Sequence, residues 1–235
     1  MFEQVYYPDK LYPQQLDELL LKGWFRMGQS IFTTPYTLFD NRMYETIWLR
    51  HVLKNYEESK TIRNLKKRNR DFSVELKKVD ITNQHESLFK KYKDSIQFNA
   101  ASSLEQLLNG YSVEGTNIYN TYEINLYDDG KLIGCSYFDI GYKSAEGISA
   151  FYDPDYVQHS LGKYLIYLQI EVCKGNEFDY FYPGYFVPGF PHLDYKLKIG
   201  SACLEFLNPE TLEWQPIESY EHQGIPLHYQ IYFSD

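Results

Sequence analysis

YNTYEINLYDDGKLIGCSYFDIGY, residues 119–142, carries the strongest structural signal in the chain. Residues 119–127 alternate with the period of two that is typical of a strand with one buried face, and residues 131–142 form a second apolar run. Asp129-Gly130 between them is a tight-turn dipeptide. The stretch therefore predicts an antiparallel β-hairpin, and GISAFY at residues 147–152 predicts a further strand.

Apolar residues at helical spacing flank this hairpin on both sides. They predict helices at residues 11–20 before Gly23, at 60–71 with Ser59 as N-cap, through most of 83–108, and at 161–173. Further strands are expected at 43–52, at 74–79 and at 178–183, the last ended by Pro183-Gly184, and residues 204–220 alternate weakly. Helices that segregate from antiparallel strands indicate an α+β fold with a mixed, largely antiparallel sheet and flanking helices.

The charge balance limits the partners of the protein. The 235 residues include 23 basic and 32 acidic side chains, which gives a formal net charge of −9. A globally basic nucleic-acid coat is therefore excluded, and any RNA contact must use a local patch. No uncharged apolar run reaches the ~18 residues that span a bilayer. We expect a cytoplasmic protein without a membrane partner.

The chemically reactive residues argue against several enzyme classes. Cys135, Cys173 and Cys203 are odd in number and form no C-x-x-C pair, which disfavours disulfides and a thiolate metal site. The six histidines show no i, i+4 pair, so we expect no metal ion. No G-x-S-x-G, P-loop or G-x-G-x-x-G motif supports a hydrolase or a nucleotide-phosphate site. Cys173 is expected to be a buried structural thiol.

A run of six bases contrasts with the negative total charge. Two interpretations stay open: a solvated helix face, which is what such runs usually are, or a cradle for nucleic-acid phosphates. The residues are Lys60, Arg63, Lys66, Lys67, Arg68 and Arg70.

Two further segments could form sites. Asp153-Pro-Asp155 leads into a helix that starts near Ser160-Leu-Gly-Lys163, where free N–H groups favour an anion; an ordinary helix start is the alternative. DYFYPGYFVPGFPHLDYKLK, residues 179–198, combines turn-forming glycines and prolines with tyrosines and Lys196. Such a segment is typical of a site loop and equally of an aromatic-packed surface loop.

Read together, GISAFYDPDYVQHSLGKYLIYLQIE (147–171) and DYFYPGYFVPGFPHLDYK (179–196) resemble the aminoacyl-tRNA–protein transferases of the arginyl-transferase family, which include bacterial leucyl-transferring members. GWFRMGQSIFTTP (23–35) and KTIRNLKKRNRDF (60–72) are similar to the opening block and the basic helix of that family. The resemblance covers most of the chain and is strongest from about residue 121 to 198.

The resemblance implies a fold and an activity. The fold is an acyltransferase fold like that of the N-acetyltransferases (GNAT-like), with an N-terminal subdomain at residues 1–75 and a transferase domain at 76–235. The activity is transfer of arginine or leucine from charged tRNA to the free α-amine of proteins, typically those beginning with Asp or Glu, in the N-degron pathway. Aminoacyl-tRNA is then a co-substrate, no cofactor is expected, and the oligomeric state stays open.

The sequence departs from the family pattern at two places. Residues 36–39 stand where many members carry a cysteine cluster for a metal or an iron–sulfur centre, so the N-terminal subdomain lacks that cluster. His159 replaces the arginine that precedes S-L-G. A non-catalytic homologue that binds acidic N-termini or tRNA is therefore one alternative. An acetyl-CoA-dependent N-acetyltransferase is another, although Tyr164 stands where its pyrophosphate motif needs a small residue.

The residue types and the resemblance together give each candidate a role. Lys196 is expected to pair with the acidic N-terminal side chain, because a flexible point cation can follow either Asp or Glu. For the base, Asp153 is preferred to Asp155 and Glu146 because it heads the turn. The predicted site residues are Asp153, Tyr182 and Lys196 for catalysis; Tyr185, Tyr195, Ser160, Gly162 and Lys163 for the substrates; and Arg63, Lys66, Lys67, Arg68 and Arg70 for tRNA phosphates.

Overall fold

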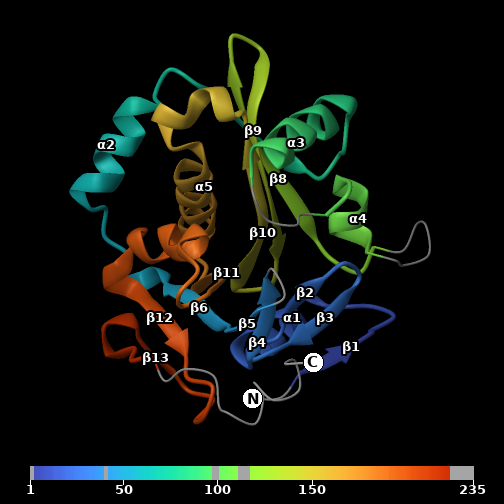
Figure 1. Ribbon diagram of the computed structural model, residues 1–235, viewed down its shortest axis with the longest axis vertical. Helices are drawn as coiled ribbons and strands as arrows, with labels where there is room; N and C mark the ends of the chain where they lie inside the picture. The colour runs from blue at the N-terminus through green and yellow to red at the C-terminus, as the bar shows by residue number, and fades with distance from the viewer. Residues whose placement is uncertain (1–2, 40–41, 97–100, 111–116, 223–235) are drawn as a thin grey trace.

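A computed structural model describes residues 3–39, 42–96, 101–110 and 117–222. Its centre is an eight-stranded sheet with the strand order β13-β12-β6-β11-β10-β9-β8-β7 (Figure 1). All neighbouring strands are antiparallel except β10 and β11, which run parallel. The strands are β6 (Ile47–Val52), β7 (Ser73–Lys78), β8 (Thr121–Asp128), β9 (Lys131–Ile140), β10 (Ser144–Tyr152), β11 (Tyr180–Phe186), β12 (Leu204–Leu207) and β13 (Trp214–Pro216).

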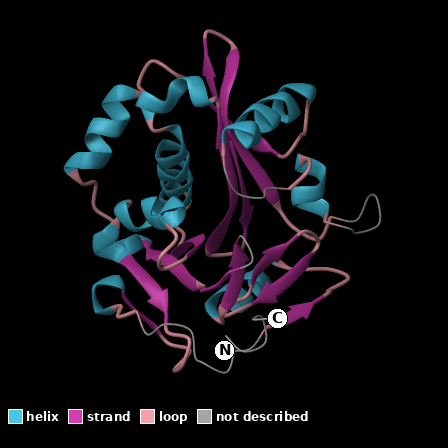
Figure 2. Cartoon of the chain, in the orientation of Figure 1, coloured by secondary structure: helices cyan, strands magenta, loops and turns pink. Residues whose placement is uncertain are grey.

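Helices cover both faces of this sheet. On one face lie α5 (Leu161–Gly175), which connects β10 to the parallel strand β11, and α2 (Lys60–Arg68). On the other face lie α3 (Asn83–Ser95) and α4 (Leu104–Asn109). Figure 2 shows the two helical layers with the sheet between them. This three-layer arrangement confirms the predicted α+β class, with a largely antiparallel sheet and flanking helices.

Two buried clusters hold the layers together. Leu161 and Leu165 of α5 pack with Ile133 and Phe138 of β9, and all four are fully buried. Across the sheet, Phe89 of α3 packs edge to face on Phe151 of β10, with ring centroids 5.3 Å apart. Because neighbouring positions of a strand point to opposite faces, β9 contributes to both clusters.

The N-terminal residues add one helix and two small sheets at one end of the molecule (Figure 1). The helix is α1 (Pro13–Leu21). The three-stranded sheet contains β1 (Gln4–Tyr6), β3 (Ser30–Thr33) and β2 (Phe25–Met27), and the two-stranded sheet contains β4 (Tyr36–Phe39) and β5 (Arg42–Glu45). Five short 3₁₀-helices complete the fold: η1 (Leu53–Asn55), η2 (Pro154–His159), η3 (Pro191–Lys198), η4 (Ser201–Cys203) and η5 (Ile217–Ser219).

Most long elements agree with the sequence predictions. β8 and β9 form the predicted hairpin, and Asp129 and Gly130 at its turn have φ values of 48° and 80°. Ser59 caps α2 because its hydroxyl accepts a hydrogen bond from the backbone N–H of Ile62. Cys173 is fully buried, and burial raises the pKa of its thiol, as expected for a structural residue.

Four boundaries differ from the predictions. The predicted strand at 43–52 is two strands, because buried Thr46 interrupts it and donates its hydroxyl to the backbone oxygen of Thr34. The predicted helix at 83–108 contains α3 and α4 instead, and residues 97–100 lie outside the described residues. The helix at 60–71 ends at Arg68, with Asn69 as its C-cap. β11 passes through Pro183-Gly184, where its pairing with β6 shifts register, and continues to Phe186.

The two predicted parts share the large sheet. β6 belongs to residues 1–75 but lies between β11 and β12, and β7 spans the predicted boundary. The carboxylate of Asp17 in α1 accepts hydrogen bonds from the backbone N–H of Lys143 and the hydroxyl of Ser144 at the start of β10. The division at residue 75 stays a prediction, and the contacts join the two parts closely.

Candidate functional site

A cleft of about 1130 Å³ opens where the N-terminal strands meet the large sheet, and we call it the main cleft. Its walls come from the β2–β3 hairpin, β6, the start of β10, the C-terminal end of α4, the end of β11, and η3. Its lining includes Phe25, Gly28, Phe32, Trp48, Glu146, Gly184, Tyr185, Leu193 and Lys196.

Lys196 brings a positive charge into the main cleft. The side chain is half-buried, and its Nζ donates a hydrogen bond to the backbone oxygen of Tyr185 at 2.9 Å. Among the described residues no carboxylate forms an ion pair with it. Burial lowers the pKa of Lys196 to about 8, because the charged form loses hydration. The ammonium therefore has donors left for a ligand.

Gly184 makes room for this ammonium. The residue has a φ of +87°, and a Cβ at this position would lie 3.3 Å from the Nζ of Lys196. A glycine therefore fits both the backbone conformation and the close approach of the lysine.

Glu146 brings a carboxyl group into the same cleft. Only 4% of the residue is exposed. Its Oε1 accepts a hydrogen bond from the backbone N–H of Arg26 at 2.8 Å, whereas its Oε2 has no partner in the described part of the chain. Burial, and after it the nearby charge of Asp139, raises the pKa of Glu146 to about 8. The main cleft thus contains an acid and a base that both titrate slightly above neutral pH.

Arg26 fixes the position of Glu146. Its guanidinium forms a buried ion pair with Asp139 at 3.0 Å and also donates to the Thr121 hydroxyl and the Gly28 backbone oxygen. Arg26 was not among the predicted site residues, because it stands alone between apolar neighbours and, apart from Gly28, its partners lie 82 to 120 positions further along the chain. The one signal that includes Arg26 is the stretch 23–35, which is similar to the opening block of the family.

Asp153, the preferred base, lies away from the main cleft. It follows the C-terminal end of β10, whereas Glu146 is near the start, and seven residues of strand span roughly 23 Å. The Asp153 carboxylate accepts hydrogen bonds from Lys91 and Lys131. Burial acts to raise its pKa, but these hydrogen bonds outweigh burial and lower it. The sequence prediction preferred Asp153 to Glu146 as the base, but of these two acids Glu146 is the one that lines the main cleft.

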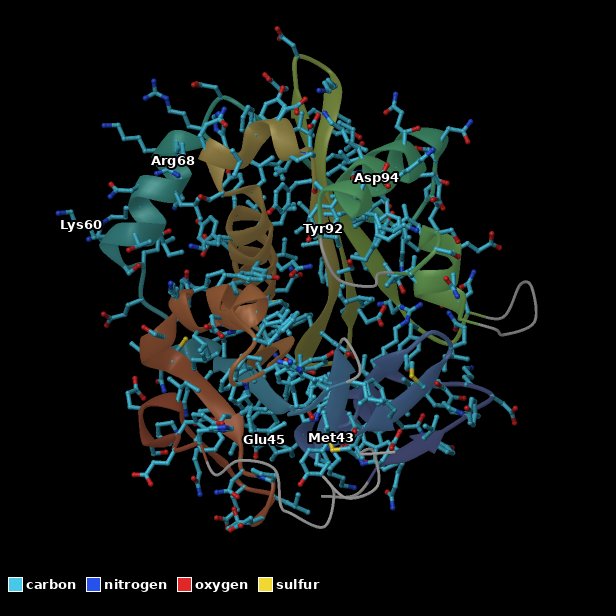
Figure 3. All side chains as sticks on the ribbon, viewed as in Figure 1. Met43, Glu45, Lys60, Arg68, Tyr92 and Asp94 are labelled. Carbon is cyan, nitrogen blue, oxygen red and sulfur yellow. The ribbon has the colours of Figure 1, made fainter. Side chains whose placement is uncertain are left out.

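The three predicted tyrosines separate. Tyr185 lines the main cleft and packs edge to face on Trp48, with ring centroids 5.0 Å apart. Tyr182 is buried in an apolar cluster with Leu16 and Leu20 of α1, and its ring centroid lies 5.6 Å from that of Trp214. Tyr195 packs against the cluster under α5 and lies near Tyr92 (labelled in Figure 3). Only Tyr185 is therefore placed to touch a ligand in the main cleft.

A second, smaller cleft of about 430 Å³ lies between α2 and the start of α5, and we call it the cationic cleft. Arg68, Ser160, Lys163 and Lys198 line it. The guanidinium of Arg68 donates to the backbone oxygen of Gln158 at 2.8 Å. Three cations from α2, α5 and η3 meet here, so the cationic cleft favours an anion. The sequence analysis did not select Lys198.

Ser160 and Gly162 shape the start of α5. Ser160 adopts the left-handed conformation, with a φ of 53°. A Cβ at Gly162 would lie 3.0 Å from the ring of Tyr152, so Gly162 packs on that ring and does not line the cationic cleft. His159 does not line the cationic cleft, and its Nδ1 lies 3.2 Å from the Asn69 side-chain oxygen.

The other bases of α2 differ in their availability. Lys66 pairs with the Glu58 carboxylate at 2.5 Å, and Arg63 donates to the backbone oxygen of Glu58. Arg70 lies 3.5 Å from the Asp71 carboxylate, and both side chains are exposed. Lys67 is exposed to solvent. Figure 3 shows Lys60 and Arg68 at opposite ends of α2.

One buried group of side chains has the composition of a metal site. The ligand atoms of His85, Glu123 and Cys135 lie within 4.8 Å of one another. However, the Nδ1 of His85 accepts from the backbone N–H of Thr82, so its Nε2 carries the proton and points to the Asn125 oxygen at 3.1 Å. Burial also raises the pKa of the Cys135 thiol well above its usual value. Thr82 and Asn125 occupy both ring nitrogens of His85, and the Cys135 thiol stays protonated, so the three groups do not fit a metal.

The cationic cleft and the larger cleft, which holds a buried acid and a half-buried lysine, together fit a transferase class of site, suited to an anionic donor and a polar acceptor. The sequence model of the family described as "Arginine-tRNA-protein transferase, C terminus" matches residues 84–204. The chain belongs to this family, which confirms the resemblance seen in the sequence, and the protein is an aminoacyltransferase.

Curated relatives cover most of the chain. An "Aspartate/glutamate leucyltransferase" from Campylobacter jejuni is 31% identical over 185 residues, which are 77% of this chain and 75% of that protein. One from Leptospira interrogans is 28% identical over 212 residues, or 81% of this chain and 79% of that protein.

Solved structures show weaker similarity. The C-terminal domain of a putative lysylphosphatidylglycerol synthetase from Agrobacterium fabrum has a TM-score of 0.46 at 13% identity, over 65% of this chain and 50% of that chain. The ribosomal-protein-S18-alanine N-acetyltransferase from Escherichia coli has a TM-score of 0.31 at 13% identity, over 44% of this chain and 61% of that chain. Within the described residues, no helix is long and apolar enough to cross a membrane.

Proposed function

We propose that this protein transfers leucine from leucyl-tRNA to the α-amine of proteins that begin with Asp or Glu. The names of its relatives support this substrate choice. The observation that carries the proposal is Lys196, a half-buried ammonium that faces the main cleft without an ion-pair partner among the described residues. A carboxylate from an Asp or Glu side chain supplies the missing partner.

The apolar part of the main cleft favours leucine over arginine as the transferred group. Phe32, Trp48 and Leu193 line the cleft and offer an apolar surface to a leucyl side chain. An arginyl group would place its guanidinium in a cleft that already contains Lys196. The geometry therefore favours leucine, one of the two amino acids that the sequence resemblance allowed.

The cationic cleft provides a place for phosphates near the aminoacylated end of the tRNA. Arg68, Lys163 and Lys198 supply three positive charges there, although the total charge of the protein is −9. His159 replaces the family arginine, and Arg68 brings a guanidinium from α2 to the same turn. η3 connects the two clefts, since Lys198 lines one and Lys196 the other.

Positioning accounts for the reaction without a covalent enzyme intermediate. The ester of aminoacyl-tRNA is already activated, and alignment with a neutral amine can contribute several kcal/mol to lowering the barrier. Among the ionisable groups that line the main cleft, we assign Glu146 and Lys196 to the acceptor, while Asp153 and Tyr182 stay in structural contacts. The need for charged tRNA leads us to propose the cytoplasm as the location.

A transfer assay tests the proposal directly. Leu-tRNA and Arg-tRNA are each combined with peptides that begin with Asp, Glu or Asn, and the peptide mass is measured. We expect a mass increase of one leucyl residue on the Asp and Glu peptides only. Transfer of arginine would reject the leucine assignment, and peptide or tRNA binding without any transfer would identify a non-catalytic homologue. A titration with acetyl-CoA, for which we expect no thermal stabilisation, tests the acetyltransferase alternative.

A further inference from the structure

Glu146 has a buried carboxylate oxygen without a partner. Its Oε1 is held by the backbone N–H of Arg26, but its Oε2 has no hydrogen-bond donor in the described part of the chain. A buried acceptor without a donor lowers stability, so such groups are uncommon in native proteins and require an explanation. An incoming donor from a substrate would explain it.

The location of Glu146 fits that explanation. The residue lines the main cleft, and Gly147 and Lys196 line the same cleft. The pairing of β10 with β9 shifts register between Gly147 and Ser149. Such a bulge changes the direction of nearby side chains and is often found beside active sites.

Charged and titratable groups from several elements face Glu146. Arg26 comes from β2, Asp139 from β9 and Tyr119 from the segment before β8, while Lys196 of η3 lines the same cleft. The ion pair between Arg26 and Asp139 is fully buried, so these two charges largely compensate each other. Glu146 itself is almost fully buried, so burial is the main influence on its carboxyl group, followed by the charge of Asp139.

We propose that Glu146 is the proton acceptor for the substrate α-amine in the transfer reaction, with Oε2 as the accepting atom. The inference rests on the proposed function. The neutral amine nitrogen bonds to the ester carbonyl carbon, and the proton that this nitrogen then carries passes to Oε2. The bond between the carbonyl carbon and the ribose oxygen breaks, and Glu146 returns the proton to that oxygen, so that an amide and a free ribose hydroxyl result.

The titration range of Glu146 suits this role. Burial raises its pKa to about 8, and an α-amino group in a peptide has a pKa of about 7.7–8.0. Proton transfer between groups of matched pKa needs little driving force, and the ionised fraction of Glu146 grows over the same pH range as the neutral fraction of the amine. Asp153, whose pKa is lowered and whose oxygens are occupied, lacks this match.

The test compares Glu146→Gln with Glu171→Gln. The first variant keeps the shape and the oxygen that accepts from Arg26. The second makes the same chemical change on α5, where the Oε1 of Glu171 also lacks a hydrogen-bond partner but lines neither cleft. kcat/KM for leucine transfer to an Asp peptide is measured from pH 6 to 9, peptide affinity is measured by calorimetry, and folding is checked by thermal unfolding.

We expect Glu146→Gln to lower kcat/KM about 100-fold or more and to leave peptide affinity within about twofold of the natural value. Below pH 7.5, the plot of log kcat/KM against pH should have a slope of about one for this variant, compared with about two for the natural protein. Glu171→Gln should match the natural protein. If the natural protein is active and the Glu146→Gln variant is equally active or equally pH-dependent, this proposal is overturned and the proposed function stays intact. A natural protein that transfers nothing would overturn both.

Discussion

Burial moves the pKa values of two residues in the main cleft in opposite directions. The pKa of Lys196 is lowered and the pKa of Glu146 is raised, and both pKa values reach about 8. At neutral pH both groups are mainly protonated, so together they contribute about one positive charge to the cleft. An acceptor with a carboxylate side chain matches this charge, whereas an uncharged or basic N-terminal side chain does not.

We predict that Lys196→Met lowers the affinity for an Asp peptide about tenfold or more, because the substitution removes the cation and keeps the apolar stem. For the natural protein, affinity should fall as the pH rises above about 8, where Lys196 loses its proton. A peptide beginning with Asn provides the control, since its affinity should change little with the substitution. Calorimetry with both peptides measures the effect, and equal losses for the two would remove Lys196 from acidic recognition.

We also predict a pH-dependent stability effect at Glu146. Its folded-state pKa is raised from 4.5 to about 8, so the folded state binds an extra proton between these values and stability decreases as the pH rises through this range. Glu146→Gln should remove this decrease, on the order of a few kcal/mol by pH 8. Chemical unfolding at pH 5 and pH 8 checks it. If the free energy of unfolding differs between pH 5 and pH 8 by the same amount in the variant and in the natural protein, Glu146 is ionised at little cost in the folded protein.

Individual elements differ in how far the sequence predicted them. The β8–β9 hairpin, α2 and α5 were predicted because apolar periodicity and caps are local signals. β1 to β4 were missed, since strands of three or four residues are too short to show a period and depend on pairing within small sheets. The cationic cleft joins residues from α2, α5 and η3, so sequence could supply Arg68 and Lys163 but not their proximity to Lys198.

At the level of α2 and its neighbours, we predict that the combined change Arg68→Ala, Lys163→Ala and Lys198→Ala weakens tRNA binding and reduces the slope of log affinity against log salt by about two. The three cations line one cleft, so they would release counterions together. Lys60→Ala at the other end of α2 serves as the control (Figure 3). Fluorescence titrations at several salt concentrations measure both slopes, and an unchanged slope in the triple variant would separate the cationic cleft from the RNA footprint.

The β2–β3 hairpin turn provides a stability prediction for an element contact. Gly28 has a φ of +60°, and a Cβ there would lie 2.9 Å from the Cα of Gly110 at the end of α4. Gly28→Ala should therefore destabilise the protein by about 2 kcal/mol or more. Gly130→Ala, with a φ of +80° and nothing within 4 Å of its Cβ, carries backbone strain alone and should cost about 1 kcal/mol. Equal losses in chemical unfolding would mean that α4 moves aside at no cost.

On the scale of the whole molecule, β6 ties the N-terminal residues to the C-terminal ones. All six of its residues are buried, and it pairs with β11 on one side and β12 on the other. The predicted activity and family rested most strongly on motifs between about residues 121 and 198, but the main cleft also needs Arg26 and Trp48 from the first half. Long-range strand pairing sets their place in the cleft, and a single sequence does not reveal such pairing.

We predict that the molecule unfolds as one cooperative unit. Variants that keep only Trp48 or only Trp214 report from β6 and β13, which are joined through β12. Their fluorescence transitions in denaturant should coincide. Two separate midpoints would instead support independent folding of residues 1–75 and 76–235, and the domain division predicted from sequence would then describe the folding units.

The position of β6 has a consequence for biosynthesis. The strand leaves the ribosome early, but its two partners follow about 130 to 155 residues later. At about 5–20 residues per second, β6 waits roughly 7–30 s for them, and during this time its apolar side chains and backbone groups lack their partners. The nascent chain therefore passes through a period in which binding by a chaperone, or self-association between polysomes, competes with completion of the sheet.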